Sequence, residues 1–120
     1  MEARKEYEYN PRGFMEEIPN LSYVISLVKD DFEFRSKFLA IIKREFPMEL
    51  EKYLLHMRRD EPRAAAELVH KLKYRVSALG MDQSFELTEK HEERLQLGDT
   101  SLDFEFRRIL KKIVAYLDKI

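Results

Sequence analysis

The chain of 120 residues has no cysteine, and it has only 3 glycines and 4 prolines. Without cysteine, disulfide bonds and thiolate metal sites are excluded. A short chain with few turn residues favours long helices over a many-stranded β fold. The glycines stand alone, so the glycine-rich loops that cradle nucleotide phosphates are missing as well. We therefore expect an all-α protein that does not bind ATP through such a loop.

Long hydrophobic runs and an excess of one charge are also lacking. No apolar run approaches the roughly 18 residues that span a bilayer, and residues 1–6 are not followed by the apolar segment of a signal peptide. The 22 basic and 23 acidic residues give a net charge of -1, which provides no overall attraction to nucleic acid or to an anionic membrane. These absences predict a cytoplasmic protein with no nucleic-acid partner and no membrane partner.

Apolar residues make up 44% of the chain and charged residues 38%, which is typical of one helical domain with a single core. Residues 1–14 show no clear period, and we interpret them as a flexible N-terminal lead. Residues 15–120 carry apolar residues at helical spacing and form the predicted domain. Short links between the predicted helices require neighbours to run antiparallel. The expected fold is an antiparallel up-down four-helix bundle with a short extra N-terminal helix.

The first two helices are predicted to begin at side chains that can cap them. Asn20 suits the cap of the short helix, and Asp31 suits the cap of the long helix that follows. The apolar spacing of this long helix continues across Pro47, although proline removes one backbone donor and crowds the preceding turn. We therefore expect one long kinked helix rather than two helices that meet at Pro47.

The other three helices have similar signals at their ends. Asp60 is the expected cap of the third helix, and Gly80 supplies the left-handed residue that ends it. Asp82 is the expected cap of the fourth helix. The last helix is expected to open on a capping box formed by Thr100 and Asp103.

The helix that ends at Gly80 carries a histidine on its polar side. A helical wheel places the core stripe of this helix within an arc of roughly 100°, and His70 lies roughly 140° from the centre of that arc. His70 should therefore face solvent. The residues of the stripe are Ala65, Leu68, Val69, Leu72, Val76 and Leu79. The residues near His70 on the helix surface are Ala66, Glu67, Lys71, Lys73, Tyr74 and Ser77.

An exposed imidazole is a good nucleophile near neutral pH, because the ordinary pKa of histidine is about 6.5. Histidine is one of the side chains that form covalent intermediates. A phosphoryl group on His70 would gain charge-assisted hydrogen bonds from Lys73, which lies one turn further on. The spacing gives no obvious carboxylate or hydroxyl that would complete a triad, and no histidine pair has metal-ligand spacing. Spacing alone favours a simpler alternative, in which His70 is a solvated surface histidine.

Four residues of this region match a family pattern of a histidine, an apolar residue two positions on, a lysine three positions on and a glycine ten positions on. These residues are His70, Leu72, Lys73 and Gly80. In this motif the chain resembles the histidine-containing phosphotransfer (HPt) domains of two-component phosphorelays. The resemblance extends over residues 21–120, because the phenylalanine-rich helix before the motif and the residues after Gly80 also fit the family.

The resemblance implies a signal-transduction module that carries a phosphoryl group as phosphohistidine. His70 would accept the group from an aspartyl phosphate on the receiver domain of a hybrid sensor kinase and pass it to the receiver of a response regulator. Lys73 would stabilise the phosphoryl group. The module would be a monomer without kinase activity and without a cofactor of its own, because Mg²⁺ belongs to the receiver. The surrounding binding residues would be Ala66, Lys71, Tyr74 and Ser77.

One residue departs from the family pattern. Many family members have glycine directly after the lysine, which leaves the imidazole uncovered, whereas this chain has Tyr74. Tyr74 would lie beside His70, where it could restrict a partner or donate its hydroxyl to the phosphoryl group. The alternative function is therefore a non-catalytic helical bundle that binds a receiver or another signalling protein without phosphoryl transfer.

The remaining polar candidates have simpler explanations. His91 is predicted to be a semi-buried packing histidine, and His56 is predicted to lie at the edge of an apolar stripe. Glu89, Glu92 and Glu93 form a charged run that is predicted to be a solvated helix face. None of these residues rivals His70 as the reactive group.

Overall fold

The structure is a computed structural model that describes residues 16–29 and 31–120. Its helices are α3 (Ser22–Val28), α4 (Phe32–Arg58), α5 (Pro62–Ala78), α6 (Asp82–Gln96) and α7 (Asp103–Lys119). The predicted all-α fold, with a short helix before four long ones, is confirmed, and the described residues include no β-strand. None of these helices has the length and apolarity that a membrane span needs. The predicted flexible lead, residues 1–14, lies outside the described residues.

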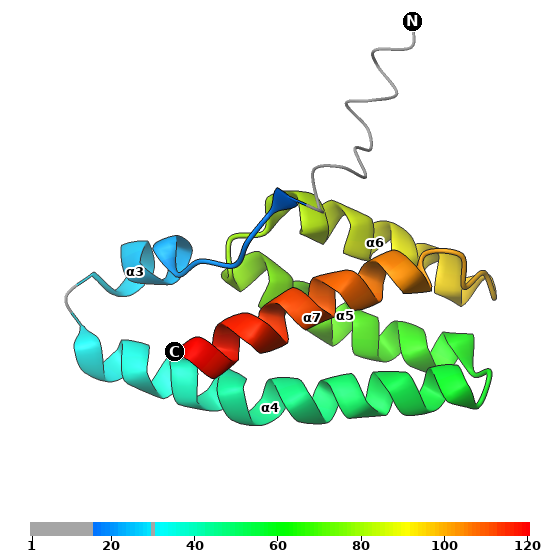
Figure 1. Ribbon diagram of the computed structural model, residues 1–120, viewed down its shortest axis with the longest axis horizontal. Helices are drawn as coiled ribbons and strands as arrows, with labels where there is room; N and C mark the ends of the chain where they lie inside the picture. The colour runs from blue at the N-terminus through cyan, green and yellow to red at the C-terminus, as the bar shows by residue number, and fades with distance from the viewer. Residues whose placement is uncertain (1–15, 30) are drawn as a thin grey trace, which may run out of the picture.

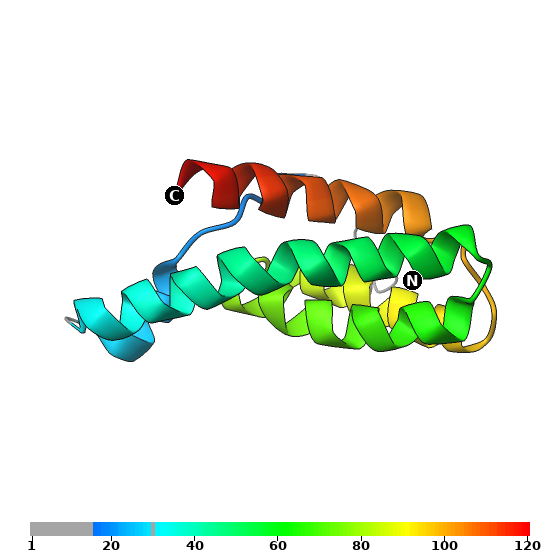
Figure 2. The ribbon, with the colours of Figure 1, turned by 90° about the horizontal axis from the view of Figure 1, so that it is seen from below.

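The four long helices alternate in direction along the bundle (Figure 1). Residues 59–61 join α4 to α5 and residues 79–81 join α5 to α6, whereas residues 97–102 join α6 to α7. Links this short place consecutive helices antiparallel and side by side. In the perpendicular view, α7 lies above α4 and α5 lies below it (Figure 2).

α4 is much longer than the helices it packs against. Its 27 residues extend about 40 Å, whereas the 17 residues of α5 or of α7 extend about 25 Å. Both ribbon views show the first turns of α4 projecting beyond the C-terminal end of α7, with α3 beside them (Figures 1 and 2). α4 continues through Pro47 as one helix, as predicted. Phe46 and Tyr53 are fully buried and hold both halves of α4 against the bundle.

The core is formed by the apolar stripes of α5, α6 and α7 and by the inner face of α4. All six residues of the predicted α5 stripe are buried. A fully buried leucine such as Leu72 stabilises the fold by about 2 kcal/mol through the removal of its surface from water. α7 contributes five buried residues to the core, which are Phe106, Ile109, Leu110, Ile113 and Leu117.

The helix-end signals at Asp31 and Gly80 are present as predicted, whereas Leu21 occupies the cap position of α3 that was predicted for Asn20. The Asp31 carboxylate accepts a hydrogen bond from the Phe34 backbone N–H at 2.9 Å and caps α4. The Asn20 side-chain oxygen accepts one from the Ser22 N–H at 3.0 Å, at the start of α3. Gly80 follows α5 with a φ of 75°, the left-handed conformation expected after a helix.

The caps predicted at Asp60 and Thr100 are wrong. Asp60 has a left-handed φ of 57° in the short link after α4, and Glu61 occupies the cap position of α5 instead. The short link needs a left-handed residue, and aspartate tolerates that conformation better than most side chains. Leu102 occupies the cap position of α7, and Asp103, the other half of the expected capping box, lies inside the helix.

The cap predicted at Asp82 is also wrong, because a carboxylate distant in the sequence caps α6. The backbone N–H groups of Gln83 and Ser84 donate to the two carboxylate oxygens of Glu17, each at 2.6 Å. The Glu17 carbonyl in turn accepts a hydrogen bond from Lys112 Nζ at 2.7 Å. The segment before α3 therefore ties the start of α6 to α7.

A chain of polar side chains crosses the core between α4, α6 and α7. The Tyr53 hydroxyl donates to Asp103 Oδ1 at 2.5 Å. Because the single hydroxyl proton is used there, His91 Nε2–H donates to the Tyr53 oxygen at 2.8 Å. Arg107 Nε donates to both Asp103 oxygens, at 3.0 and 2.9 Å. His91 packs inside the protein, as predicted, and is fully buried, and its Nδ1 has no hydrogen-bond partner among the described residues.

Candidate functional site

His70 lies on the solvent side of α5, as its place on the helical wheel predicts. Its side chain is 51% exposed, although the neighbouring Val69 is fully buried in the core. Core packing therefore fixes the backbone that carries the imidazole, while the ring itself meets solvent. This combination allows another molecule to reach the ring.

Glu92 on α6 orients the imidazole. His70 Nδ1–H donates to Glu92 Oε2 at 2.9 Å, because an ionised carboxylate can only accept. The Glu92 side chain is 14% exposed, so its surroundings hold it in place. In the neutral imidazole the other nitrogen, Nε2, then carries a lone pair and no proton. Nε2 is therefore the nucleophilic atom of the ring.

Lys73 lies one turn from His70, but it is not a free cation. Its Nζ lies 3.0 Å from Glu92 Oε1, and its side chain is 13% exposed. Burial alone would lower the pKa of Lys73, but the hydrogen bond and the negative charge of Glu92 outweigh burial and raise it. One carboxylate thus holds both the imidazole and the ammonium group, and Lys73 stays charged.

Tyr74 lies beside His70, as its spacing predicts, without burying it. The two ring centroids are 5.4 Å apart and the rings are nearly perpendicular, at 86°. The Lys73 ammonium lies 5.6 Å from the centroid of the Tyr74 ring, within cation–π range. Tyr74 is itself 58% exposed, which is high for an aromatic side chain. It covers one flank of the imidazole and leaves the rest open.

The other predicted site residues lie at different depths around His70. Ala66 is buried, so its methyl group belongs to the core as well as to the floor of the site. Lys71 is exposed and faces solvent beside His70. Ser77 is exposed and lies two turns beyond His70, on the far side of Tyr74. A hollow of about 420 Å³ is lined by Ala66, Glu67, His70, Lys71, Glu92 and Gln96.

The prediction that Glu92 belongs to a solvated helix face is wrong, although Glu89 and Glu93 are exposed as expected. A signal for the position of Glu92 does exist in the sequence. His70 lies eleven residues before Met81 and Glu92 lies eleven residues after it. In an antiparallel pair of helices that turns at this point, such residues face each other. The charged run alone could not single out Glu92 from its neighbours.

Two arginines connect the site helix to its neighbours. Arg75 Nε and one terminal nitrogen donate to the two carboxylate oxygens of Glu49 on α4, at 3.2 and 2.9 Å, and the terminal nitrogen also reaches Glu45 at 2.7 Å. The bonds to Glu49 and Glu45 raise the pKa of Arg75. Arg63 Nε donates to the Gln96 carbonyl on α6 at 3.2 Å. α5 is therefore anchored on both sides near His70.

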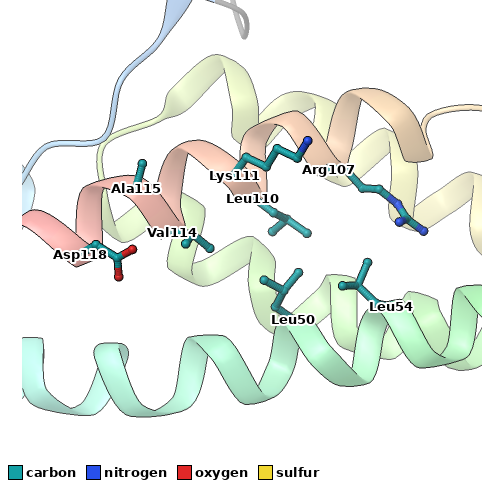
Figure 3. A pocket seen from close by; sticks show the side chains of 8 residues that line it. All are labelled: Leu50, Leu54, Arg107, Leu110, Lys111, Val114, Ala115 and Asp118. Atoms are coloured by element: carbon teal, nitrogen blue, oxygen red, sulfur yellow. The ribbon is translucent and has the colours of Figure 1, made fainter.

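A second hollow, of about 440 Å³, lies between α4 and α7 (Figure 3). Its apolar walls are Leu50, Leu54, Leu110, Val114 and Ala115, and Arg107, Lys111 and Asp118 lie at its rim. None of these side chains is a nucleophile held by a second group in the way that His70 is held by Glu92. The described residues also include no cluster of three or more His, Cys, Asp or Glu side chains placed to hold a metal ion.

Comparison of the chain with protein-family models, with curated proteins and with solved structures finds no match. The site offers an oriented and exposed imidazole with a free lone pair on Nε2, and a charged lysine one turn away. Such an arrangement can accept an electrophilic group and stabilise the negative charge that the group carries.

Proposed function

We propose that the protein is a phosphorelay intermediate of the HPt type. His70 accepts a phosphoryl group from the aspartyl phosphate of one receiver domain and passes it to another receiver. The observation that carries this proposal is the bond between His70 Nδ1–H and Glu92, which leaves Nε2 as an exposed nucleophile. The match of His70, Leu72, Lys73 and Gly80 to the family pattern supports the same function.

The forward step balances without a general base. The lone pair of His70 Nε2 attacks phosphorus and forms a P–N bond. The P–O bond to the donor aspartate breaks, and the aspartate keeps the electron pair as a carboxylate. The imidazole becomes positively charged and keeps its Nδ1 proton, which Glu92 holds. Transfer to a second receiver reverses these changes and restores the neutral ring.

Glu92 and Lys73 have different roles in this step. Glu92 holds the ring orientation and stabilises the positive charge that develops on the imidazole, because its hydrogen bond becomes charge-assisted on both sides. Lys73 has three N–H donors, so it can keep its bond to Glu92 and donate a second hydrogen bond to a phosphoryl oxygen. Mg²⁺ would belong to the receiver, where it neutralises the acyl phosphate.

The test uses a receiver domain that acetyl phosphate has phosphorylated, incubated with the protein in the presence of Mg²⁺. We expect a phosphoryl label on the chain that is stable to alkali and lost in acid. His70→Gln should remove the label without a change in helical circular dichroism, and His56→Gln, on α4, should keep it. Glu92→Gln should slow labelling by about tenfold, since it replaces a charge-assisted hydrogen bond by a neutral one.

Label that remains on the His70→Gln protein would contradict the proposal. Receiver binding without any label on the wild-type chain would favour the alternative, a non-catalytic interaction bundle. One version of that alternative expects Tyr74 to cover the histidine, and the 51% exposure of the His70 side chain weighs against it.

A further inference from the structure

We infer that Tyr74 closes one flank of His70, so that a reaction partner reaches Nε2 across the hollow formed with Gln96 on α6. The opposite flank, toward the C-terminal end of α5, is closed. Tyr74 is thus a residue that sets the direction of approach and the shape of partner that fits. For phosphoryl transfer this inference rests on the proposed function, whereas for a small reagent that attacks histidine it does not.

Helix geometry explains why Tyr74 covers the flank on its own side. Side chains on an α-helix lean toward the N-terminus, so the side chain of a residue covers the turn that precedes it. Tyr74 is four residues after His70 and therefore leans onto the turn that carries the imidazole. The perpendicular ring contact, with centroids 5.4 Å apart, places an aromatic ring against that side of His70.

The Tyr74 ring also has a reason to stay where it is. Lys73, which Glu92 holds at 3.0 Å, lies 5.6 Å from the Tyr74 ring centroid. The ammonium therefore attracts the face of the tyrosine ring, and the same ring meets the imidazole in a perpendicular arrangement. Glu92 indirectly positions Tyr74 in this way, and the side chains of Lys73 and Tyr74 form one wall of the site.

On the other flank of His70 the surface is hollow rather than filled. The hollow of about 420 Å³ is lined by His70, Ala66, Lys71 and Gln96 among others, and neither Tyr74 nor Lys73 lines it. Ala66 is the residue one turn before His70, and its small side chain leaves the space that a larger residue would occupy. Lys71 at the edge of this hollow offers a positive charge to an incoming anion.

The test uses two exposed residues of α6 that lie on either side of Glu92. Gln96 is four residues after Glu92 and lines the hollow, whereas Glu89 is three residues before it, toward the Tyr74 side. Tryptophan at each position adds the same bulk at a solvent-facing site. Gln96→Trp should block the open flank, and Glu89→Trp should add bulk only where Tyr74 already closes the approach.

The first probe is diethyl pyrocarbonate, which needs no partner protein. His70 Nε2 attacks one of the reagent's carbonyl carbons, and monoethyl carbonate leaves with the electron pair. The ring then releases its Nδ1 proton to the medium. Mass spectrometry of the His70 peptide, normalised to the His56 peptide, gives the rate. We expect Gln96→Trp to slow the reaction of His70 by about tenfold or more and Glu89→Trp to change it by less than about twofold. Tyr74→Ala should speed the reaction of His70. In a protein that carries Tyr74→Ala, adding Glu89→Trp should then slow this reaction.

Equal slowing by the two tryptophan variants, or no effect of Tyr74→Ala, would overturn the inference. The second probe is a phosphorylated receiver with Mg²⁺, for which the same ranking of variants is expected. The two claims can fail separately. If the reagent shows the asymmetry and no receiver labels His70, the proposed function fails and the closed flank remains. If receivers label His70 equally in all variants, the closed flank does not direct the transfer.

Discussion

His91 should make the protein lose stability as the pH falls toward 5. Its imidazole is fully buried between α4, α6 and α7. Burial disfavours the charged form and lowers the pKa of His91 from 6.5 to about 4, against the opposing effect of Asp103. Because the folded-state pKa lies below the unfolded-state value, the unfolded chain takes up a proton first. The contribution of neutral His91 to the unfolding free energy is therefore fully present above about pH 6.5, and it is lost as the pH drops toward 4.

The size of the effect follows from the two pKa values. With 6.5 in the unfolded chain and about 4 in the folded chain, protonation of His91 removes about 2 kcal/mol of unfolding free energy between pH 7 and about pH 5. This is a large share of the 5–15 kcal/mol or so that stabilises a typical domain. Most carboxylates ionise below this range, so the change around pH 5 to 7 is the cleanest part of the curve.

The assay is urea unfolding followed by far-ultraviolet circular dichroism at several pH values between about 5 and 7. His91→Gln removes the titrating group while its amide can still donate to the Tyr53 oxygen. The unfolding free energy of the His91→Gln protein should fall by about 2 kcal/mol less than that of the wild type over this range. Tyr53→Phe is the matched control, because it removes the hydroxyl partner and keeps His91 buried. It should be less stable at every pH and retain the wild-type slope.

Equal losses of stability by the His91→Gln and wild-type proteins between about pH 7 and pH 5 would show that His91 does not cause the pH dependence.

Two further predictions concern the fold. Gly80→Ala should destabilise the protein more than Gly98→Ala does. Both glycines have a left-handed φ, which costs an alanine about 1–2 kcal/mol, but only at Gly80 would the new methyl carbon lie 2.7 Å from the Asn20 side chain. Thermal unfolding of the two variants ranks them, and the reverse order would contradict this account. Leu72→Ala should cost about 2–5 kcal/mol, because Leu72 is fully buried. A loss under about 1 kcal/mol in urea unfolding would show that the core closes around the change.

Periodicity predicted the fold well, because the apolar faces of these helices are set by local spacing alone. The α5 stripe and the exposure of His70 both follow from positions on one helical wheel. Asp31 was also predictable as a cap, since its bond reaches a residue only three positions away.

The features that sequence analysis missed depend on contacts between distant segments. Glu17 caps α6 from more than sixty residues away, so the local signal at Asp82 pointed to the wrong side chain. Glu92 looked like one member of a charged run, and only the antiparallel packing of α5 on α6 separates it from Glu89 and Glu93. The charge of Lys73 was predictable, but its engagement by Glu92 was not. Side-chain pairing across helices is the information that periodicity lacks.

The site residues His70, Lys73, Tyr74 and Glu92 all belong to two consecutive helices and the turn at residues 79–81 between them. The residues of the site thus come from one short continuous stretch of the chain. Insertions in the connections outside the α5–α6 pair leave the spacing between His70 and Glu92 along the chain unchanged. One residue added within α5 after Tyr74 rotates the following residues by about 100° and takes Glu92 out of reach of His70. The relative placement of these four side chains is therefore set by the pairing of α5 with α6, and a change that shifts one of these two helices along the other would separate them.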